Sequence, residues 1–115
     1  MAIATQEVNA AVEKAAKEVA RKSALKLTPV LRDQAFRAEW PSEIVIELSV
    51  KAEDENLYIS YPDEFDSRIE DLEYGSQSQS PRPVLRPFMA RYASNLEEEI
   101  TESVVDILSD MGALS

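Results

Sequence analysis

The sequence contains no cysteine and no histidine, and it has only two glycines. Without cysteine there is no disulfide, no thiol nucleophile and no thiolate ligand for zinc or an iron–sulfur cluster. Without histidine the chain lacks the commonest general base and metal ligand. A glycine-rich phosphate-binding loop needs more glycine than this chain holds. We therefore expect a protein that is not an enzyme and that uses no metal and no cofactor.

Long apolar runs are also missing. The uncharged apolar stretches fall well short of the roughly 20 residues that span a bilayer, so no membrane partner is expected. The segment from Met1 to Glu7 has neither the basic nor the apolar region of a secretion signal. At 115 residues, with 44% hydrophobic and 30% charged side chains, the chain has the size and composition of one folded domain.

The formal net charge is −10, and it is unevenly distributed. Residues 1–38 carry seven basic and four acidic side chains, whereas residues 39–73 carry twelve acidic and two basic ones. Residues 74–93 hold three arginines and no acid, and residues 94–115 hold six acids and no base. This alternation favours head-to-tail packing against copies of the same chain through complementary charge. The other interpretation is an acidic face that keeps the domain in solution.

Apolar side chains recur at helical spacing near both ends of the chain. Small residues on one face predict a first helix over residues 5–27: Val8, Val12, Ala15 and Val19. Thr28 and Pro29 are typical of the cap and first turn of a new short helix, so we expect a break there. A longer series predicts a helix over residues 87–111: Phe88, Tyr92, Leu96, Ile100, Val104, Ile107, Leu108 and Met111.

Residues 44–61 predict an antiparallel β-hairpin. The apolar residues of its first strand alternate along the chain: Ile44, Ile46, Leu48 and Val50. A charged turn precedes a second strand, which Pro62 ends. Gly75 is placed to stop a short helix, and residues 75–83, rich in serine and glutamine, predict a flexible loop. The expected fold class is α+β, with a small antiparallel β-sheet packed by an N-terminal helix and a long C-terminal helix.

Two short motifs flank this loop. Glu73-Tyr74-Gly75-Ser76 precedes it, and Pro83-Val84-Leu85-Arg86-Pro87 follows it at the opening of the last helix. Together they resemble the small tail-component or neck protein family of lambda-like siphophages, in which an aromatic residue and Gly-Thr are followed by a loop and Pro-Phe-Leu-Arg-Pro. Thr28-Pro29-Val30-Leu31-Arg32 is similar to the family's Thr-Gly-x-Leu-Arg, with proline in place of glycine.

The resemblance implies a structural virion protein of a tailed bacteriophage. Proteins of this family form or join a ring, commonly of six copies, at the head–tail junction through which double-stranded DNA passes. The implied partners are other copies of the chain, head-side connector or stopper proteins and the tail-tube protein. The implied location is the neck or tail of the virion, assembled in the host cytoplasm. Tail completion protein, tail terminator and head-side connector all remain open.

Two groups of candidate interface residues follow. Subunit contacts are expected around the motifs: Tyr74, Gly75, Arg82, Pro83, Leu85, Arg86, Pro87 and Phe88. The Arg86 stem can pack on apolar surface while its guanidinium either meets a carboxylate or stays solvated. An acidic channel lining, which repels phosphate and lets DNA slide, is expected from four residues: Glu47, Glu53, Asp54 and Glu55.

The net charge also fits a different class of protein. An acidic domain of this size can imitate DNA and occupy the DNA groove of a host DNA-binding enzyme, which it then inhibits. The basic stretches at residues 1–38 and 74–93 do not fit a uniformly acidic mimic. This alternative stays open beside the virion protein.

Overall fold

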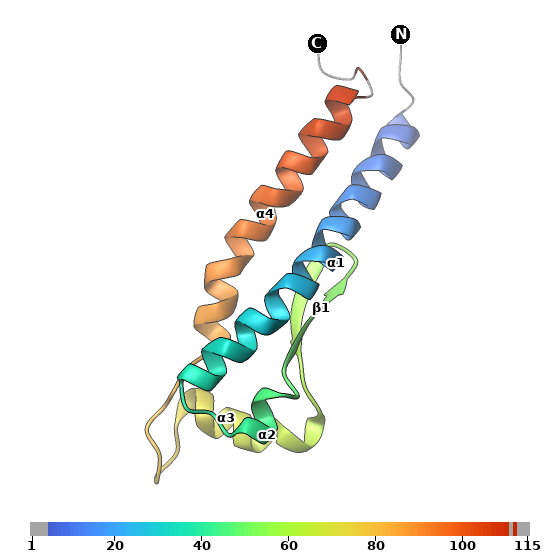
Figure 1. Cartoon of the computed structure of the whole chain (residues 1–115). Coiled ribbons are helices and arrows are strands. Elements are labelled where there is room, and N and C mark those ends of the chain that lie inside the picture. The colour runs from blue at the N-terminus through green and yellow to red at the C-terminus, as the bar shows by residue number, and fades with distance from the viewer. Residues whose placement is uncertain (1–4, 111, 113–115) are drawn as a thin grey trace.

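The computed structural model describes residues 5–110 and 112, and within them the predicted α+β class is confirmed. Two long helices accompany a two-stranded antiparallel sheet (Figure 1). The elements in chain order are α1 (Thr5–Arg37), α2 (Ser42–Val45), β1 (Ser49–Glu53), β2 (Asn56–Ser60), the 3₁₀ helix η1 (Asp63–Phe65), α3 (Asp66–Tyr74) and α4 (Leu85–Asp110). The molecule is elongated, with extents of 66 × 22 × 20 Å, because α1 and α4 run side by side beyond the sheet.

The helix break expected at Thr28 and Pro29 is wrong, because α1 continues through Pro29 to Arg37. Proline removes one helical N–H, and this leaves the carbonyl of Leu25 without its usual donor. Pro29 and Leu25 both lie on the exposed side of α1, where water can solvate that carbonyl. The Thr28 hydroxyl bonds the carbonyl of Ala24 at 3.0 Å instead of capping a new helix.

The expected hairpin is shorter than residues 44–61, because its predicted first residues form the helical turn α2. Ile44 and Val45 are both buried, whereas Ile46 is 63% exposed, and a strand with one buried face cannot produce that pattern. The strands pair from Ser49 with Ser60 to Glu53 with Asn56. Asp54 turns the chain with a φ of 56°, a conformation that aspartate tolerates better than most residues.

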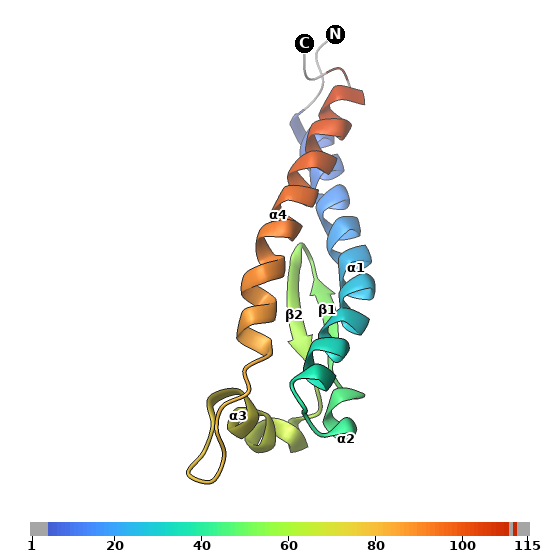
Figure 2. The same cartoon turned by 60° about the vertical axis from the view of Figure 1, so that its left-hand side comes forward.

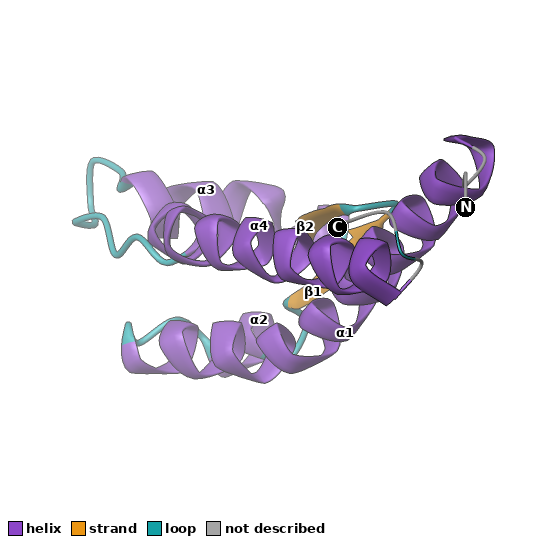
Figure 3. Ribbon diagram, turned by 90° about the horizontal axis from the view of Figure 1, so that it is seen from above, coloured by secondary structure: helices purple, strands orange, loops and turns teal. Residues whose placement is uncertain are grey.

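The hairpin is attached to α1 along β1. The Thr28 hydroxyl accepts the N–H of Val50 at 2.9 Å, and the Arg32 side chain donates to the carbonyl of Leu48 at 2.8 Å. Figures 2 and 3 both place β1 toward α1 and β2 toward α4. The two strands therefore cover α1 more than α4.

The hydrophobic core lies in the half of the molecule that holds α2, α3 and the start of α4. Its largest fully buried side chains come from four elements or their flanks: Leu31, Ile44, Leu48 and Phe88. In the other half, the buried residues of α1 are alanines: Ala15, Ala16 and Ala20. The outer halves of α1 and α4 thus form a two-helix arm in which the larger apolar side chains that the structure describes, such as Val19 and Ile107, are only half-buried.

The C-terminal helix begins two residues earlier than predicted. Leu85 is its first residue, and Pro87 occupies the first turn, where no N–H is lost. It extends to Asp110, and the predicted final residue, Met111, lies outside the described residues. Gly112 follows with a φ of 74°.

Candidate functional site

The structure brings the two motifs together at the junction of α3 and α4. Glu73, in the last turn of α3, is 2% exposed and directs its carboxylate at the first residues of α4. It accepts the backbone N–H groups of Val84 at 2.8 Å, Leu85 at 2.9 Å and Arg86 at 2.9 Å. A carboxylate at this position satisfies amides that have no partner within the helix and complements the helix dipole. Glu73 therefore caps α4 across the loop.

The Arg86 side chain also contacts Glu73. Its Nη2 donates to the backbone carbonyl of Glu73 at 3.2 Å, and its Nε lies 3.4 Å from Glu73 Oε1. The guanidinium also lies over the Tyr74 ring, 4.3 Å from the centroid, in a cation–π contact. The Arg86 side chain is nevertheless 56% exposed. Of the two alternatives for Arg86, the contact with a carboxylate is therefore the one observed, and part of the side chain still faces solvent.

Burial alone would raise the pKa of the Glu73 carboxyl, because a charged group loses hydration when it is enclosed. The backbone N–H groups of Arg86, Val84 and Leu85, together with the Arg86 side chain, outweigh that effect. The net result is a pKa below the ordinary value for glutamate. Glu73 therefore serves as a charged structural acceptor at neutral pH.

Gly75 ends α3 as predicted, with a φ of 84°. Its N–H donates to the carbonyl of Asp71 at 2.8 Å. A Cβ at this position would lie 2.9 Å from the Cδ of Pro81, which is closer than real Cβ atoms approach. Both the left-handed backbone and the close return of the loop therefore require glycine.

Arg82 connects the loop to the turn after α1. Its N–H donates to the carbonyl of Leu72 at 2.7 Å, and its own carbonyl accepts the indole N–H of Trp40 at 2.9 Å. Its guanidinium reaches the carbonyl of Glu39 at 2.7 Å. Within the loop predicted to be flexible, Ser76 and Gln79 pair in a short β-bridge. The loop is thus bonded to α3 and Trp40 near the point where α4 begins.

The structure separates the predicted interface residues into core and surface. Phe88 is 1% exposed and packs in the core, so the expectation that it contacts a partner is wrong for the folded chain. Leu85 is half-buried, and Gly75 and Arg82 act within the junction. The residues that present surface are Tyr74, Pro83, Arg86 and Pro87. We call these four residues the junction surface.

A pocket of about 360 Å³ lies beside Arg86 and Tyr74. Tyr61 lines it, and burial, a hydrogen bond with Asp66 and nearby carboxylates raise the pKa of the Tyr61 hydroxyl. Glu70 also lines the pocket. The pocket thus brings the Arg86 guanidinium, two tyrosine rings and carboxylates together.

The four predicted channel-lining acids do not form one cluster. Glu53, Asp54 and Glu55 lie together at the exposed hairpin turn, and Asp54 lies 3.8 Å from the Lys17 ammonium. Glu47 precedes β1 at the opposite end of the strand, roughly 20 Å away at the usual rise of a strand. The four acids thus lie at both ends of β1, and their place in a channel lining stays a prediction.

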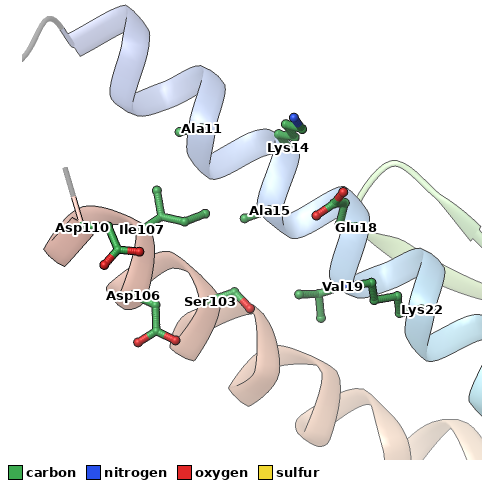
Figure 4. Close-up of a pocket in the computed structure, with 10 residues that line it drawn as sticks. All are labelled: Ala11, Lys14, Ala15, Glu18, Val19, Lys22, Ser103, Asp106, Ile107 and Asp110. Atoms are coloured by element: carbon green, nitrogen blue, oxygen red, sulfur yellow. The ribbon is translucent and has the colours of Figure 1, made fainter.

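Sequence patterns had not indicated the groove of about 550 Å³ between the outer halves of α1 and α4. Figure 4 shows Ala15, Val19 and Ile107 pointing into the space between the two helices. Lys14, Glu18 and Lys22 line it from α1, and Asp106 and Asp110 line it from α4. The α1 side of the groove thus carries charges of both signs, and the α4 side is acidic.

Glu73 was also missed, because its partners lie eleven to thirteen residues further along the chain. The available signal was an acidic residue directly before Tyr74-Gly75, followed by a helix start that had no capping side chain of its own. Among residues 5–110 and 112, no group of three acidic side chains is placed to hold a metal ion.

No family model matches the chain, and neither the curated proteins nor the solved structures compared with it give a match. Of the helices in the described part of the chain, none combines the length and the apolarity that crossing a lipid bilayer requires.

Proposed function

We propose that this chain is a structural subunit of a tailed bacteriophage neck, which forms or joins a ring at the head–tail junction and catalyses no reaction. The observation that carries the proposal is the junction of α3 and α4. Four residues that match the pattern of the tail-component family help to build this junction: Tyr74, Gly75, Leu85 and Arg86. Glu73 precedes that pattern, and Val84 stands where the family has phenylalanine. A shared motif with a specific structural purpose supports a shared architecture more strongly than a short sequence match does.

The distribution of charge over the two long helices gives independent support. Between residues 94 and 110, α4 carries six acids and no base, and its exposed residues include Glu98, Glu102 and Val105. Over its full length α1 carries seven bases and four acids, and Lys14 and Arg21 are exposed. Surfaces of opposite charge on one elongated subunit favour heterologous contacts, in which one face of a subunit meets a different face of its neighbour. Contacts of this kind can close into rings.

The exposed acids at the hairpin turn suit passage of DNA. Glu53, Asp54 and Glu55 are exposed at the hairpin turn beside α1, and a ring that presents such turns inward repels the phosphate backbone. In this proposal the chain contacts copies of itself, a head-side connector or stopper and the tail tube. The proposal does not separate the tail completion, tail terminator and connector roles.

Negative-stain electron microscopy tests the proposal. The purified chain is imaged alone and after mixing with the tail tubes and head connectors of the same virus. We expect rings of uniform diameter, free or seated on tube ends or connectors. Isolated subunits in every mixture, with bare tube ends and connectors, would contradict the proposal.

One observation favours the DNA-mimic alternative, namely the six acids, with no base among them, on α4 from Glu97 to Asp110. The bases of α1 on the same two-helix arm count against it. Capture of a host nuclease from a lysate, reversed at high salt because exposed charges are then screened, would favour the mimic over the ring subunit.

A further inference from the structure

The two edges of the sheet differ in how their backbone groups are satisfied. On the β1 edge, the Thr28 hydroxyl accepts the N–H of Val50 at 2.9 Å and lies 3.3 Å from its carbonyl oxygen. The backbone groups of Val50 therefore point away from β2. In an antiparallel pair the residue opposite points its own groups outward as well, and that residue is Ile59.

The β2 edge consequently presents unpaired backbone groups. Ile59 and, two residues earlier, Leu57 direct their N–H and C=O groups away from β1. In the part of the chain that the structure describes, no residue bonds to these groups. An open strand edge of this kind is a template for pairing with another strand.

An apolar groove of about 480 Å³ lies beside this edge, between β2 and α4, with Leu27 of α1 also in its lining. Leu57 lines it from β2, and Met89, Tyr92, Leu96 and Ile100 line it from α4, each of them half-buried. Figure 2 shows β2 facing α4 while β1 lies toward α1. A third strand at the β2 edge would cover apolar surface of α4 that the present two strands leave open.

We propose that the β2 edge and this groove together bind an extended segment of a partner protein. The segment pairs with the Leu57 and Ile59 backbone, places apolar side chains at alternate positions in the groove and carries lysine or arginine at its ends. The charge of the rim argues for that chemistry. Glu55 and Glu97 line the groove, and its lining includes no basic residue.

A second copy of the chain fits this edge less well. Antiparallel pairing of two β2 strands would bring the acidic turn of one copy, with Asp54 and Glu55, toward Asp63 at the far end of the other β2 strand. Like charges near one another disfavour such pairing. The partner is therefore a different, basic segment, and the inference does not depend on the ring proposal.

The probe is a capped peptide, Lys-Val-Thr-Ile-Thr-Val-Lys, added to the full-length protein. Backbone amide exchange is followed by NMR. We expect exchange at Leu57 and Ile59 to slow by about tenfold or more at saturating peptide, because their N–H groups become paired. A peptide with glutamate in place of both lysines should bind about tenfold more weakly at low salt. A peptide methylated on the amides that face β2 should give no protection.

Leu57→Pro and Ala52→Pro form a matched pair of variants. The two residues pair across the ladder, and each change removes an N–H that points outward, but at opposite edges of the sheet. We expect Leu57→Pro to abolish binding and Ala52→Pro to retain it, with both circular dichroism spectra unchanged.

Several results would overturn the proposal. They are unchanged exchange at Leu57 and Ile59 with the lysine peptide, equal binding of the methylated peptide, or equal effects of the two proline variants. Protection that grows with protein concentration and without peptide would identify a second copy as the occupant, which also overturns it. A chain that binds the peptide yet never forms rings would support this inference and contradict the proposed function.

Discussion

Glu73 and Arg86 are bonded to one another in both directions. The carboxylate of Glu73 accepts the backbone N–H of Arg86 at 2.9 Å, while the guanidinium of Arg86 donates to the backbone carbonyl of Glu73 at 3.2 Å. This reciprocal contact joins the end of α3 to the start of α4. It fixes the direction in which α4 leaves the core, and therefore the placement of the two-helix arm.

Glu73→Gln is expected to lower the free energy of unfolding by roughly 1–2 kcal/mol at pH 7, because the charged acceptor of three backbone amides is lost. Denaturant unfolding followed by circular dichroism measures the change. Glu70→Gln, an exposed position on the same helix, serves as the control and should change stability by less than about 0.5 kcal/mol. Equal losses of stability in the two variants would show that Glu73 does not act as a cap.

The same residue predicts a pH dependence. The pKa of Glu73 is lower in the folded chain than its ordinary value of 4.5, so the unfolded chain binds the proton more readily. The stabilisation is complete above that value and is lost as the pH falls through the folded pKa. The stability difference between the wild-type chain and Glu73→Gln should therefore shrink as the pH falls below about 4.5. A difference that stays constant to pH 3 would contradict this.

Gly75→Ala is expected to destabilise the fold by roughly 2–3 kcal/mol, since alanine meets both a positive φ and the Cδ of Pro81. Gly112→Ala is the matched comparison, because that glycine also has a positive φ but no atom lies within 4 Å of the place that an alanine methyl would take. Its cost should be about 1 kcal/mol or less. Thermal unfolding of both variants separates backbone strain from the steric contact, and similar melting temperatures would refute the steric part.

Trp40→Phe removes the indole N–H that bonds the carbonyl of Arg82 at 2.9 Å. We expect a loss of about 1–2 kcal/mol, because the carbonyl is left without that donor. Trp40 is the only tryptophan, so unfolding of the variant is followed by circular dichroism. Faster backbone exchange in residues 76–83 should accompany the loss, and unchanged exchange there would show that Trp40 does not hold the loop.

Pro29→Ala is expected to stabilise the chain by about 1–2 kcal/mol. The change restores a helical N–H for the carbonyl of Leu25 in an exposed part of α1, and the gain is reduced by the greater freedom of the unfolded chain. Chemical denaturation measures it, with Lys26→Ala on the same helix as the control. A destabilised Pro29→Ala variant would mean that proline has a role in shaping α1 that its backbone chemistry does not explain.

The sequence predicted the elements whose periodicity is strong and local. The apolar series from Phe88 to Leu108 indicated α4, and Gly75 indicated the end of α3. Pro29 wrongly indicated a helix break. Its missing N–H is tolerated on the exposed side of α1, and the sequence periodicity near Pro29 does not show which side of the helix faces water. The alternation of Ile44, Ile46, Leu48 and Val50 wrongly indicated one continuous strand. Three of these residues, Ile44, Leu48 and Val50, are buried, but a turn of helix followed by a strand buries them equally well.

The candidate site could be predicted only in part, because it too depends on contacts between distant residues. Its motif residues were recognisable, but their purpose depends on contacts between α3, the loop and α4 that no local rule encodes. The cap from Glu73 and the bond from Trp40 to Arg82 join residues 11 and 42 positions apart. The open edge at Leu57 and Ile59 likewise depends on the strand register, which the bond between the Val50 N–H and the Thr28 hydroxyl indicates and which the sequence does not show.

Tyr74→Ala tests whether the junction surface takes part in assembly. Tyr74 is 59% exposed, and its ring contacts the Arg86 guanidinium, so its removal should cost the fold less than about 1 kcal/mol while weakening contacts between subunits. Tyr58→Ala, another exposed tyrosine on the hairpin, is the control. We expect fewer rings with Tyr74→Ala than with Tyr58→Ala in electron micrographs, and equal numbers would exclude Tyr74 from the contact.

Sedimentation velocity measures whether the chain assembles as a repeated structural subunit, as we propose. The purified full-length protein is examined over a wide range of concentrations, with and without its tail tubes. We expect a species whose mass is a fixed multiple of 12.9 kDa and which becomes dominant on assembly. A single species of 12.9 kDa under every condition would contradict it.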